Sequence, residues 1–138
     1  MHKVWLEGPI VKTDTLNVDF AATANQTGDF KVTPLISPKV ESGTATGTTI
    51  NVAYAITPSA GVTAKKMEVY CSTVKFPTAS TGTLANVYFS KTTPITTLTG
   101  SVAITGLTAA TKYYIRIGAQ ASTTSLFNFS NQIEVTTP

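Results

Sequence analysis

The sequence predicts an all-β protein: a seven-stranded antiparallel β-sandwich preceded by an N-terminal arm. Three observations favour this fold class. Short runs alternate apolar and polar residues with a period of two, which is typical of half-buried strands. Clusters of glycine, proline, serine and threonine separate these runs at the spacing of a sandwich. Threonine, which is β-branched and favours strands, supplies about a fifth of the 138 residues, whereas charged residues supply only 12%.

Residues 1–35 are expected to form an arm outside the sandwich. Leu16, Val18 and Phe20 alternate in one extended run, and a turn at Gly28 leads to a second run that begins at Phe30. Two extended segments with a turn between them predict a possible hairpin. A lone hairpin is marginally stable in water, so it needs its own sandwich, a sister subunit or another protein to lie on.

Trp5 stands in front of this hairpin and has two interpretations. It can pack on its own domain, or it can anchor an intermolecular contact, because tryptophan is enriched at interface hot spots. We expect the segment from Trp5 to Phe30 to pair with a neighbouring chain by strand addition or apolar docking, since edge strands invite such pairing.

Residues 36–138 are expected to form the sandwich. Each strand places alternate apolar residues on one face, which would bury against the opposite sheet. In chain order the predicted strands are KVESGTAT around Val40, TTINVAYAI, KKMEVYCS, ANVYFSK, SVAITGL, KYYIRIGAQA and NQIEVTTP.

The inward positions of these strands form the predicted core, and the alternate positions are expected to face outward. Glu68, Tyr70 and Glu134 take outward positions, and the two glutamates are interpreted as solvated. Cys71 is interpreted as a small buried residue, since free cysteine is among the most buried types. The predicted core residues are Ile50, Val52, Tyr54, Ile56, Met67, Val69, Cys71, Val102, Ile104, Tyr113, Ile115, Ile117, Ala119, Ile133 and Val135.

A tyrosine at the start of the sixth predicted strand indicates a more specific topology. In Greek-key sandwiches such a tyrosine bends back, and its hydroxyl bonds a backbone group a few residues upstream. Tyr113 follows Leu107 by six residues, so its hydroxyl can reach the TAAT turn. The spacing of Leu107, Thr111, Tyr113, Ile115, Ile117 and Ala119, with Ile133 and Val135 in the closing strand, resembles a fibronectin type III domain. Tyr54 stands where that family usually has its core tryptophan.

The sequence offers no candidate for catalysis. His2 is the sole histidine and lies at the terminus, which excludes most acid–base pairs, nucleophile triads and zinc sites. The acidic residues show no calcium-loop spacing, no glycine-rich phosphate loop occurs, and the single cysteine allows no internal disulfide. We therefore expect no enzyme activity, no cofactor and no metal.

The charge pattern also limits the partners. The net charge is +3, but the ten basic residues are scattered, whereas a nucleic-acid surface needs them clustered. No run has the length of a membrane span, and no segment fits a signal peptide. We therefore expect neither nucleic-acid binding nor membrane insertion, and synthesis in a cytosol without a leader.

The stretch STTSLFNFS between the last two strands carries three large apolar residues, Leu126, Phe127 and Phe129. Loops at the ends of sandwiches often carry recognition. These residues could form an exposed binding tip, cover the bottom of the core or meet the N-terminal arm.

Two functions follow as hypotheses. The first is a multi-copy structural protein of a phage or virus particle, a capsid decoration or a head or tail accessory, which docks on other structural proteins through its arm. The alternative is a fibronectin-like adhesion or carbohydrate-binding module outside the cell or at its surface. A sugar platform would require Tyr70, Tyr88 or Tyr114 to line up on one outer face.

Overall fold

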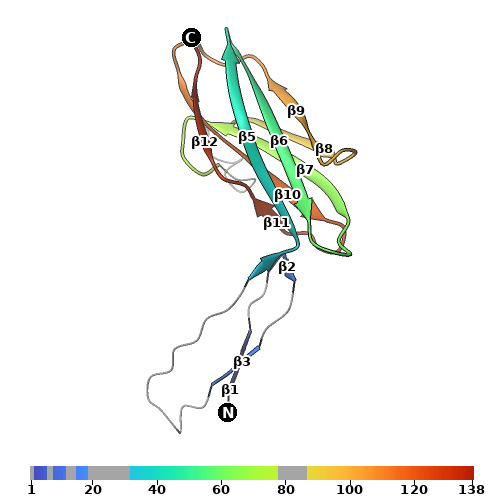
Figure 1. Cartoon of the computed structure of the whole chain (residues 1–138). Coiled ribbons are helices and arrows are strands. Elements are labelled where there is room, and N and C mark those ends of the chain that lie inside the picture. Colours follow the sequence, from blue (N-terminus) through green and yellow to red (C-terminus); the bar gives the residue numbers. More distant parts are fainter. Residues whose placement is uncertain (1, 6–7, 12–14, 19–31, 78–86) are drawn as a thin grey trace.

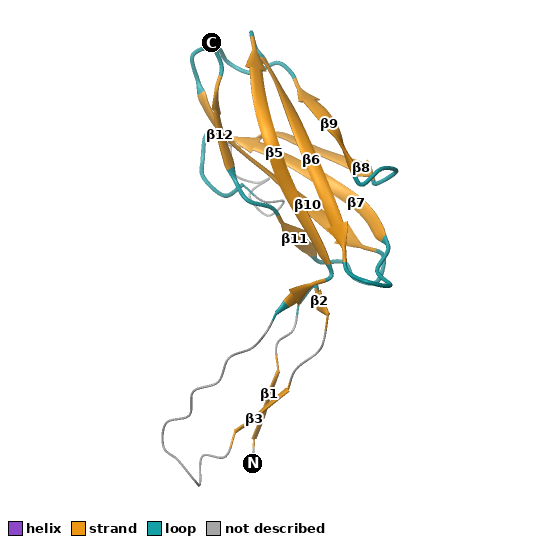
Figure 2. Ribbon diagram, in the orientation of Figure 1, coloured by secondary structure: helices purple, strands orange, loops and turns teal. Residues whose placement is uncertain are grey.

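The computed structural model describes residues 2–5, 8–11, 15–18, 32–77 and 87–138, which form strands, turns and loops without a helix (Figure 2). Two antiparallel sheets pack as a sandwich (Figure 1). The first has the order β5 (Ile36–Thr46), β6 (Thr49–Pro58) and β9 (Thr99–Ile104). The second has the order β11 (Phe127–Phe129), β10 (Lys112–Ala121), β7 (Ala64–Ser72) and β8 (Val87–Pro94), and β12 (Ile133–Thr136) also pairs with β10.

The core between the sheets follows the alternation that the sequence predicts. Ile50 and Val52 from one sheet meet Val69, Ile115 and Ile117 from the other, and all five side chains are fully buried. Cys71 is also buried, which confirms its interpretation as a core residue. Tyr54, Ile133 and Val135 are only partly buried and pack against this cluster from its margin. Each fully buried aliphatic side chain contributes about 1.5–3 kcal/mol through the hydrophobic effect.

The outward positions of β7 depart from the prediction. Glu68 is only 8% exposed and Tyr70 is fully buried, so the interpretation of Glu68 as a solvated residue is wrong. Period-two alternation assigns a residue to a face of the sheet, but it does not show whether that face is covered. Glu134, in contrast, is exposed as expected.

Tyr113 makes the contact that its position predicts. Its ring is fully buried, and its hydroxyl accepts a hydrogen bond from the backbone N–H of Thr108 at 2.9 Å. Leu107 lies beside this turn and is buried in the same core. The hydrogen bond therefore fastens the segment between β9 and β10 to the start of β10.

The described residues of the two sheets form eight strands where seven were expected, because part of the predicted loop before the last strand forms β11. Between β11 and β12, Ser130 bonds twice to Ile117 of β10: its N–H donates to the Ile117 carbonyl at 2.8 Å, and its hydroxyl accepts from the Ile117 N–H at 2.9 Å. The side chain of Asn131 then bridges to β5, where it both accepts from the N–H of Val40 at 2.9 Å and donates to its carbonyl at 3.1 Å. The segment between β11 and β12 therefore bonds to its own sheet through Ser130 and to the other sheet through Asn131.

The N-terminal segments form two small sheets beyond one end of the sandwich (Figure 1). β1 (His2–Trp5) pairs with β3 (Thr15–Val18), and β2 (Ile10–Val11) pairs with β4 (Thr33–Pro34). Residues 15–18 of the first predicted run therefore pair with an earlier strand, whereas the turn at Gly28 and Phe30, on which the predicted hairpin depends, lie outside the described residues. An alternating pattern identifies a strand but not its neighbour.

Backbone contacts fix the entry into the sandwich at Leu35. Its N–H donates to the carbonyl of Pro9 at 2.9 Å, and its own carbonyl accepts from the N–H of Ser59 at 3.0 Å. The hydroxyl of Ser59 donates to the carbonyl of Pro34 at 2.8 Å. The segment before β5 is thus tied to both the N-terminal strands and the β6–β7 connection.

Candidate functional site

The outer face of the five-stranded sheet, opposite the core, carries the most chemically varied side chains of the described residues. The register brings Glu68, Gly118 and Phe129 side by side on three neighbouring strands, and it places Tyr70 next to Arg116. We call this surface the aromatic–cation face. It comprises Lys66, Glu68 and Tyr70 of β7, Tyr114, Arg116, Gly118 and Gln120 of β10, and Phe127 and Phe129 of β11.

Two phenylalanines of β11 lie over Gly118 of β10. A Cβ atom at Gly118 would meet Phe129 Cε1 at 3.1 Å and Phe127 Cδ1 at 3.2 Å. The two rings are 6.4 Å apart between centroids, and the Tyr70 ring lies 6.1 Å from that of Phe129. Glycine therefore allows a cluster of three aromatic rings on this face.

All three cation–π contacts of the described residues involve this face. The Arg116 Cζ atom lies 4.2 Å from the centroid of Phe129, and Lys66 Nζ lies 5.1 Å from that of Phe127. Lys75, just beyond β7, places its Nζ 5.7 Å from the ring of Tyr114. Because the faces of aromatic rings carry partial negative charge, these cations are attracted to them.

Glu68 is held by three donors. The hydroxyl of Tyr70 donates to Oε2, while the Thr92 hydroxyl at 3.2 Å and Lys66 Nζ at 3.4 Å lie at Oε1. Burial, and then the hydrogen bond and charge of Glu68, raise the pKa of Tyr70. Tyr70 therefore remains a neutral donor to Glu68 at physiological pH.

The hydrogen-bond donors of Arg116 have fewer partners than the carboxylate of Glu68. Its Nε atom is buried and has no hydrogen-bond partner, and no ion pair of the described residues includes it. Burial lowers the pKa of Arg116, partly offset by Tyr70. Gln120 lies on the same face, is only 5% exposed, and its Oε1 also lacks a partner. A bound molecule with hydrogen-bonding groups could satisfy both side chains.

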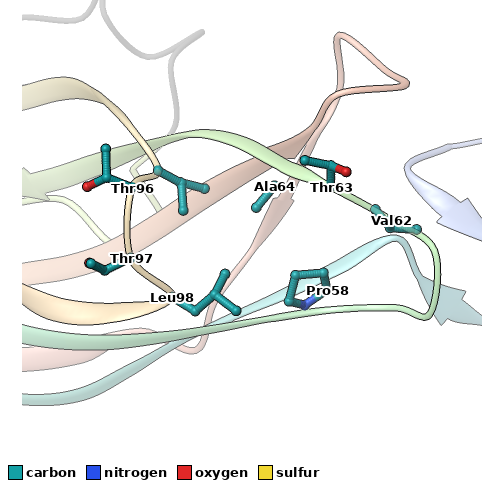
Figure 3. Close-up of a pocket in the computed structure, with 8 residues that line it drawn as sticks. Pro58, Val62, Thr63, Ala64, Thr96, Thr97 and Leu98 are labelled. Atoms are coloured by element: carbon teal, nitrogen blue, oxygen red, sulfur yellow. The ribbon is translucent and has the colours of Figure 1, made fainter.

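A second candidate is an open hollow of about 280 Å³ between the β6–β7 and β8–β9 connections (Figure 3). It offers methyl groups and hydroxyls but no aromatic or charged side chain, and so fewer means of selecting a ligand. Its lining residues are Pro58, Val62, Thr63, Ala64, Ile95, Thr96, Thr97 and Leu98.

The described residues contain no group of histidine, cysteine, aspartate and glutamate side chains that could hold a metal ion. They also include no helix with the length and apolar character needed to cross a membrane.

The structure separates the partner-binding residues that the sequence predicts. Trp5 lies on β1, and Leu16 and Val18 lie on β3, where only the strand pairing is described; Phe20 and Phe30 lie outside the described residues. Phe127 and Phe129 belong to the aromatic–cation face. Leu126 is 53% exposed just before β11. Part of the predicted loop is therefore a strand, which pairs with β10 at the edge of the sheet and places its two phenylalanines over Gly118.

Sequence reasoning missed Arg116, Gln120 and Glu68 as site residues. Part of the signal was present, because Arg116 and Glu68 are charged residues at outward positions of two predicted strands in a chain with few charges. The register between the two strands was needed to bring them together. Tyr70 and Tyr114 lie on the same face of the sheet, but Tyr70 is fully buried and offers no surface to a sugar, and the side chain of Tyr88 is not described.

Comparisons with known proteins identify the fold but not a family. No protein-family model and no curated protein sequence match this chain. A DUF3823 family protein from Bacteroides ovatus has a similar structure, with a TM-score of 0.73 and 18% identity; the match covers 99% of this chain and 72% of the other. A DUF3823 family protein from Parabacteroides merdae matches with a TM-score of 0.65 and 18% identity, over 93% and 65% of the two chains.

A third similar structure is described as a "putative carbohydrate binding protein" from Bacteroides uniformis. It has a TM-score of 0.60 and 17% identity, and the match covers 79% of this chain and 60% of the other. The chain thus spans between 60% and 72% of the length of these three proteins. At such identities the likeness concerns the fold alone.

Proposed function

We propose that this protein is a non-enzymatic carbohydrate-binding module that acts outside the cell or at its surface, with the aromatic–cation face as its binding surface. The observation that carries the proposal is the grouping of aromatic rings, cations and unpartnered polar atoms on one sheet face. Aromatic rings stack on the C–H groups of a sugar ring, while a few polar groups fix its hydroxyls.

Phe129 and Gln120 supply the two kinds of contact. Phe129 is 37% exposed and its ring is oriented by Arg116, so one aromatic surface is held in a fixed position. The Oε1 atom of Gln120 has no hydrogen-bond partner in the protein, so it would accept from a ligand hydroxyl once binding uncovers this buried amide. The carbohydrate-binding description of the similar protein from Bacteroides uniformis supports the same function.

A glycan array probed with the full chain, followed by calorimetry on its hits, tests the proposal. Phe129→Ala should weaken the Kd of a bound oligosaccharide by roughly five- to tenfold, because aromatic stacking contributes about 1 kcal/mol. Leu126→Ala is the matched control, since Leu126 is a comparably exposed apolar residue outside the face, and it should bind normally. An array without hits, or equal effects of the two variants, would contradict the proposal.

We propose further that the sandwich is a fibronectin type III-like Greek key. The order β5-β6-β9 in one sheet and β12-β10-β7-β8 in the other supports this topology, if β11 and β12 count as one interrupted strand. The buried Tyr113 and its bond to the turn before β10 also favour it.

Docking through the N-terminal arm is a second candidate function. β1 and β3 pair with each other and with no strand of the two large sheets, so among the described residues they form a separate two-stranded unit. Such a unit gains stability when it lies on another surface. The proteins compared above offer no support for a virion role, so the partner for which we propose this docking is a component of the cell surface.

A further inference from the structure

We propose that the aromatic–cation face selects an anionic glycan, whose carboxylate or sulfate groups are bound by the guanidinium of Arg116. This inference rests on the proposed function and names the class of its ligand. It is carried by the charge balance of the face and by the environment of Arg116.

Cations outnumber carboxylates on and around this face. Lys66 pairs with Glu68 at 3.4 Å, and Lys112 pairs with Glu134 at 3.3 Å. Among the described residues, neither Arg116 nor Lys75 has a carboxylate partner. Two positive charges therefore remain to complement an anionic ligand.

A cation–π contact holds the guanidinium of Arg116 beside the aromatic cluster. Its Cζ atom lies 4.2 Å from the centroid of the Phe129 ring. Burying the Nε donor without a partner costs about 1–3 kcal/mol, so the protein itself leaves the donors of this guanidinium incompletely satisfied. A carboxylate or sulfate can accept two parallel N–H bonds from one guanidinium, and such charge-assisted bonds are among the strongest in proteins.

The neighbours of Arg116 favour a sugar as the carrier of the anion. Phe129 borders it on one side, and Gln120 lies four residues further along the same strand face, about 13 Å away at the usual strand rise. Gly118, midway between the two, adds no side chain of its own. A ligand that spans these positions meets an anion site, an aromatic surface and an amide in succession, as an oligosaccharide with acidic groups requires.

Binding of paired probes to the full chain tests this inference, by calorimetry at low and at moderate salt. The carboxylate arm compares hexagalacturonic acid with its methyl ester. The sulfate arm compares a κ-carrageenan hexasaccharide with its desulfated form. At least one anionic probe should bind tenfold or more tightly than its neutral counterpart, and salt should weaken it because a partly exposed ion pair is screened. The arm that shows the preference identifies the anion.

Three variants locate the effect. Arg116→Gln should abolish the preference for the anionic probe, and Arg116→Lys should restore only part of it, because lysine cannot form the two-point contact. Lys39→Gln removes an exposed cation from β5 on the other sheet and should leave both affinities unchanged. Thermal unfolding of each variant verifies that the sandwich is intact.

The outcomes separate this inference from the proposed function. If neutral and anionic probes bind equally, or if Arg116→Gln keeps the preference, the anion site is wrong while carbohydrate binding stands. If Lys39→Gln reduces the preference as much as Arg116→Gln does, the effect reflects overall charge, and the role of Arg116 is overturned. If no glycan of the array and neither probe pair binds, both proposals fail together.

Discussion

Single residues decide how the two faces of the five-stranded sheet are used. On the core side, the Cys71 side chain is fully buried, and this burial raises its pKa to about 12. On the outer side, Tyr70 and Glu68 form a buried hydrogen-bonded pair under Phe129. One strand thus carries an inert core thiol and a polar network on opposite faces, so burial alone does not distinguish core from site.

Removal of the Tyr113 hydroxyl tests how much its hydrogen bond stabilises the turn before β10. Tyr113→Phe removes the acceptor for the N–H of Thr108, so the free energy of unfolding should fall by about 1 kcal/mol, the usual net contribution of one hydrogen bond. Urea denaturation measures this change. Glycan binding should persist, because Tyr113 faces the core. Tyr114→Phe, one residue along and on the opposite face, is the control for stability, and loss of binding by Tyr113→Phe at unchanged stability would contradict this role.

Two glycines show how elements approach one another closely on each side of the molecule. At Gly43, an added Cβ would meet Ile133 Cδ1 at 2.7 Å and Val135 Cγ2 at 2.8 Å, so glycine allows β12 to pack on β5. At Gly118, an added Cβ would meet the rings of Phe127 and Phe129 instead. Gly43 therefore allows close packing between the two sheets, whereas Gly118 makes room for the phenylalanine rings of the aromatic–cation face.

Alanine at these two glycines should have separable effects. Gly43→Ala should lower the free energy of unfolding by about 1–3 kcal/mol through overpacking, with glycan binding retained by the folded fraction. Gly118→Ala should displace the phenylalanines of β11 and weaken glycan binding, with a smaller loss of stability because those rings are partly exposed. Urea denaturation and calorimetry measure the two effects. If Gly43→Ala weakened glycan binding and Gly118→Ala left it unchanged, β11 would not shape the aromatic–cation face.

At the scale of the whole molecule, the aromatic–cation face and the N-terminal arm occupy different parts of the chain. The face is built from β7, β10 and β11, whereas the arm consists of β1 to β4 beyond one end of the sandwich (Figure 1). The contacts of Leu35 with Pro9 and Ser59 connect the two regions. Binding and docking can therefore be separated experimentally.

Deletion of residues 1–34 tests this division. The remaining chain should fold as a sandwich and bind glycans with unchanged Kd, while losing any association that depends on the arm. It loses the bond from Ser59 to Pro34, so a modest decrease in thermal stability is expected. Calorimetry and thermal unfolding of both chains measure the outcome. A truncated chain that folds but no longer binds glycans would place the arm within the binding site.

The sequence by itself determined the all-β class, the start of the sandwich near residue 36, most of the core and the bond of Tyr113. Those features are local, because strand periodicity and a tyrosine six residues after Leu107 can be read within one segment. It also suggested that Phe127 and Phe129 take part in recognition. A sugar platform that includes Tyr70 or Tyr114 was only one of several arrangements that the sequence left open for the alternative function.

Only the tertiary structure decided which strands are neighbours, and with them the pairing of β3 with β1, the break between β11 and β12, and the burial of Glu68. The candidate site depends on the same information. Arg116, Phe129 and Glu68 are far apart in sequence and meet only through the register of three strands. Alternation assigns each residue to a face, but register is set by long-range pairing, which local patterns do not encode.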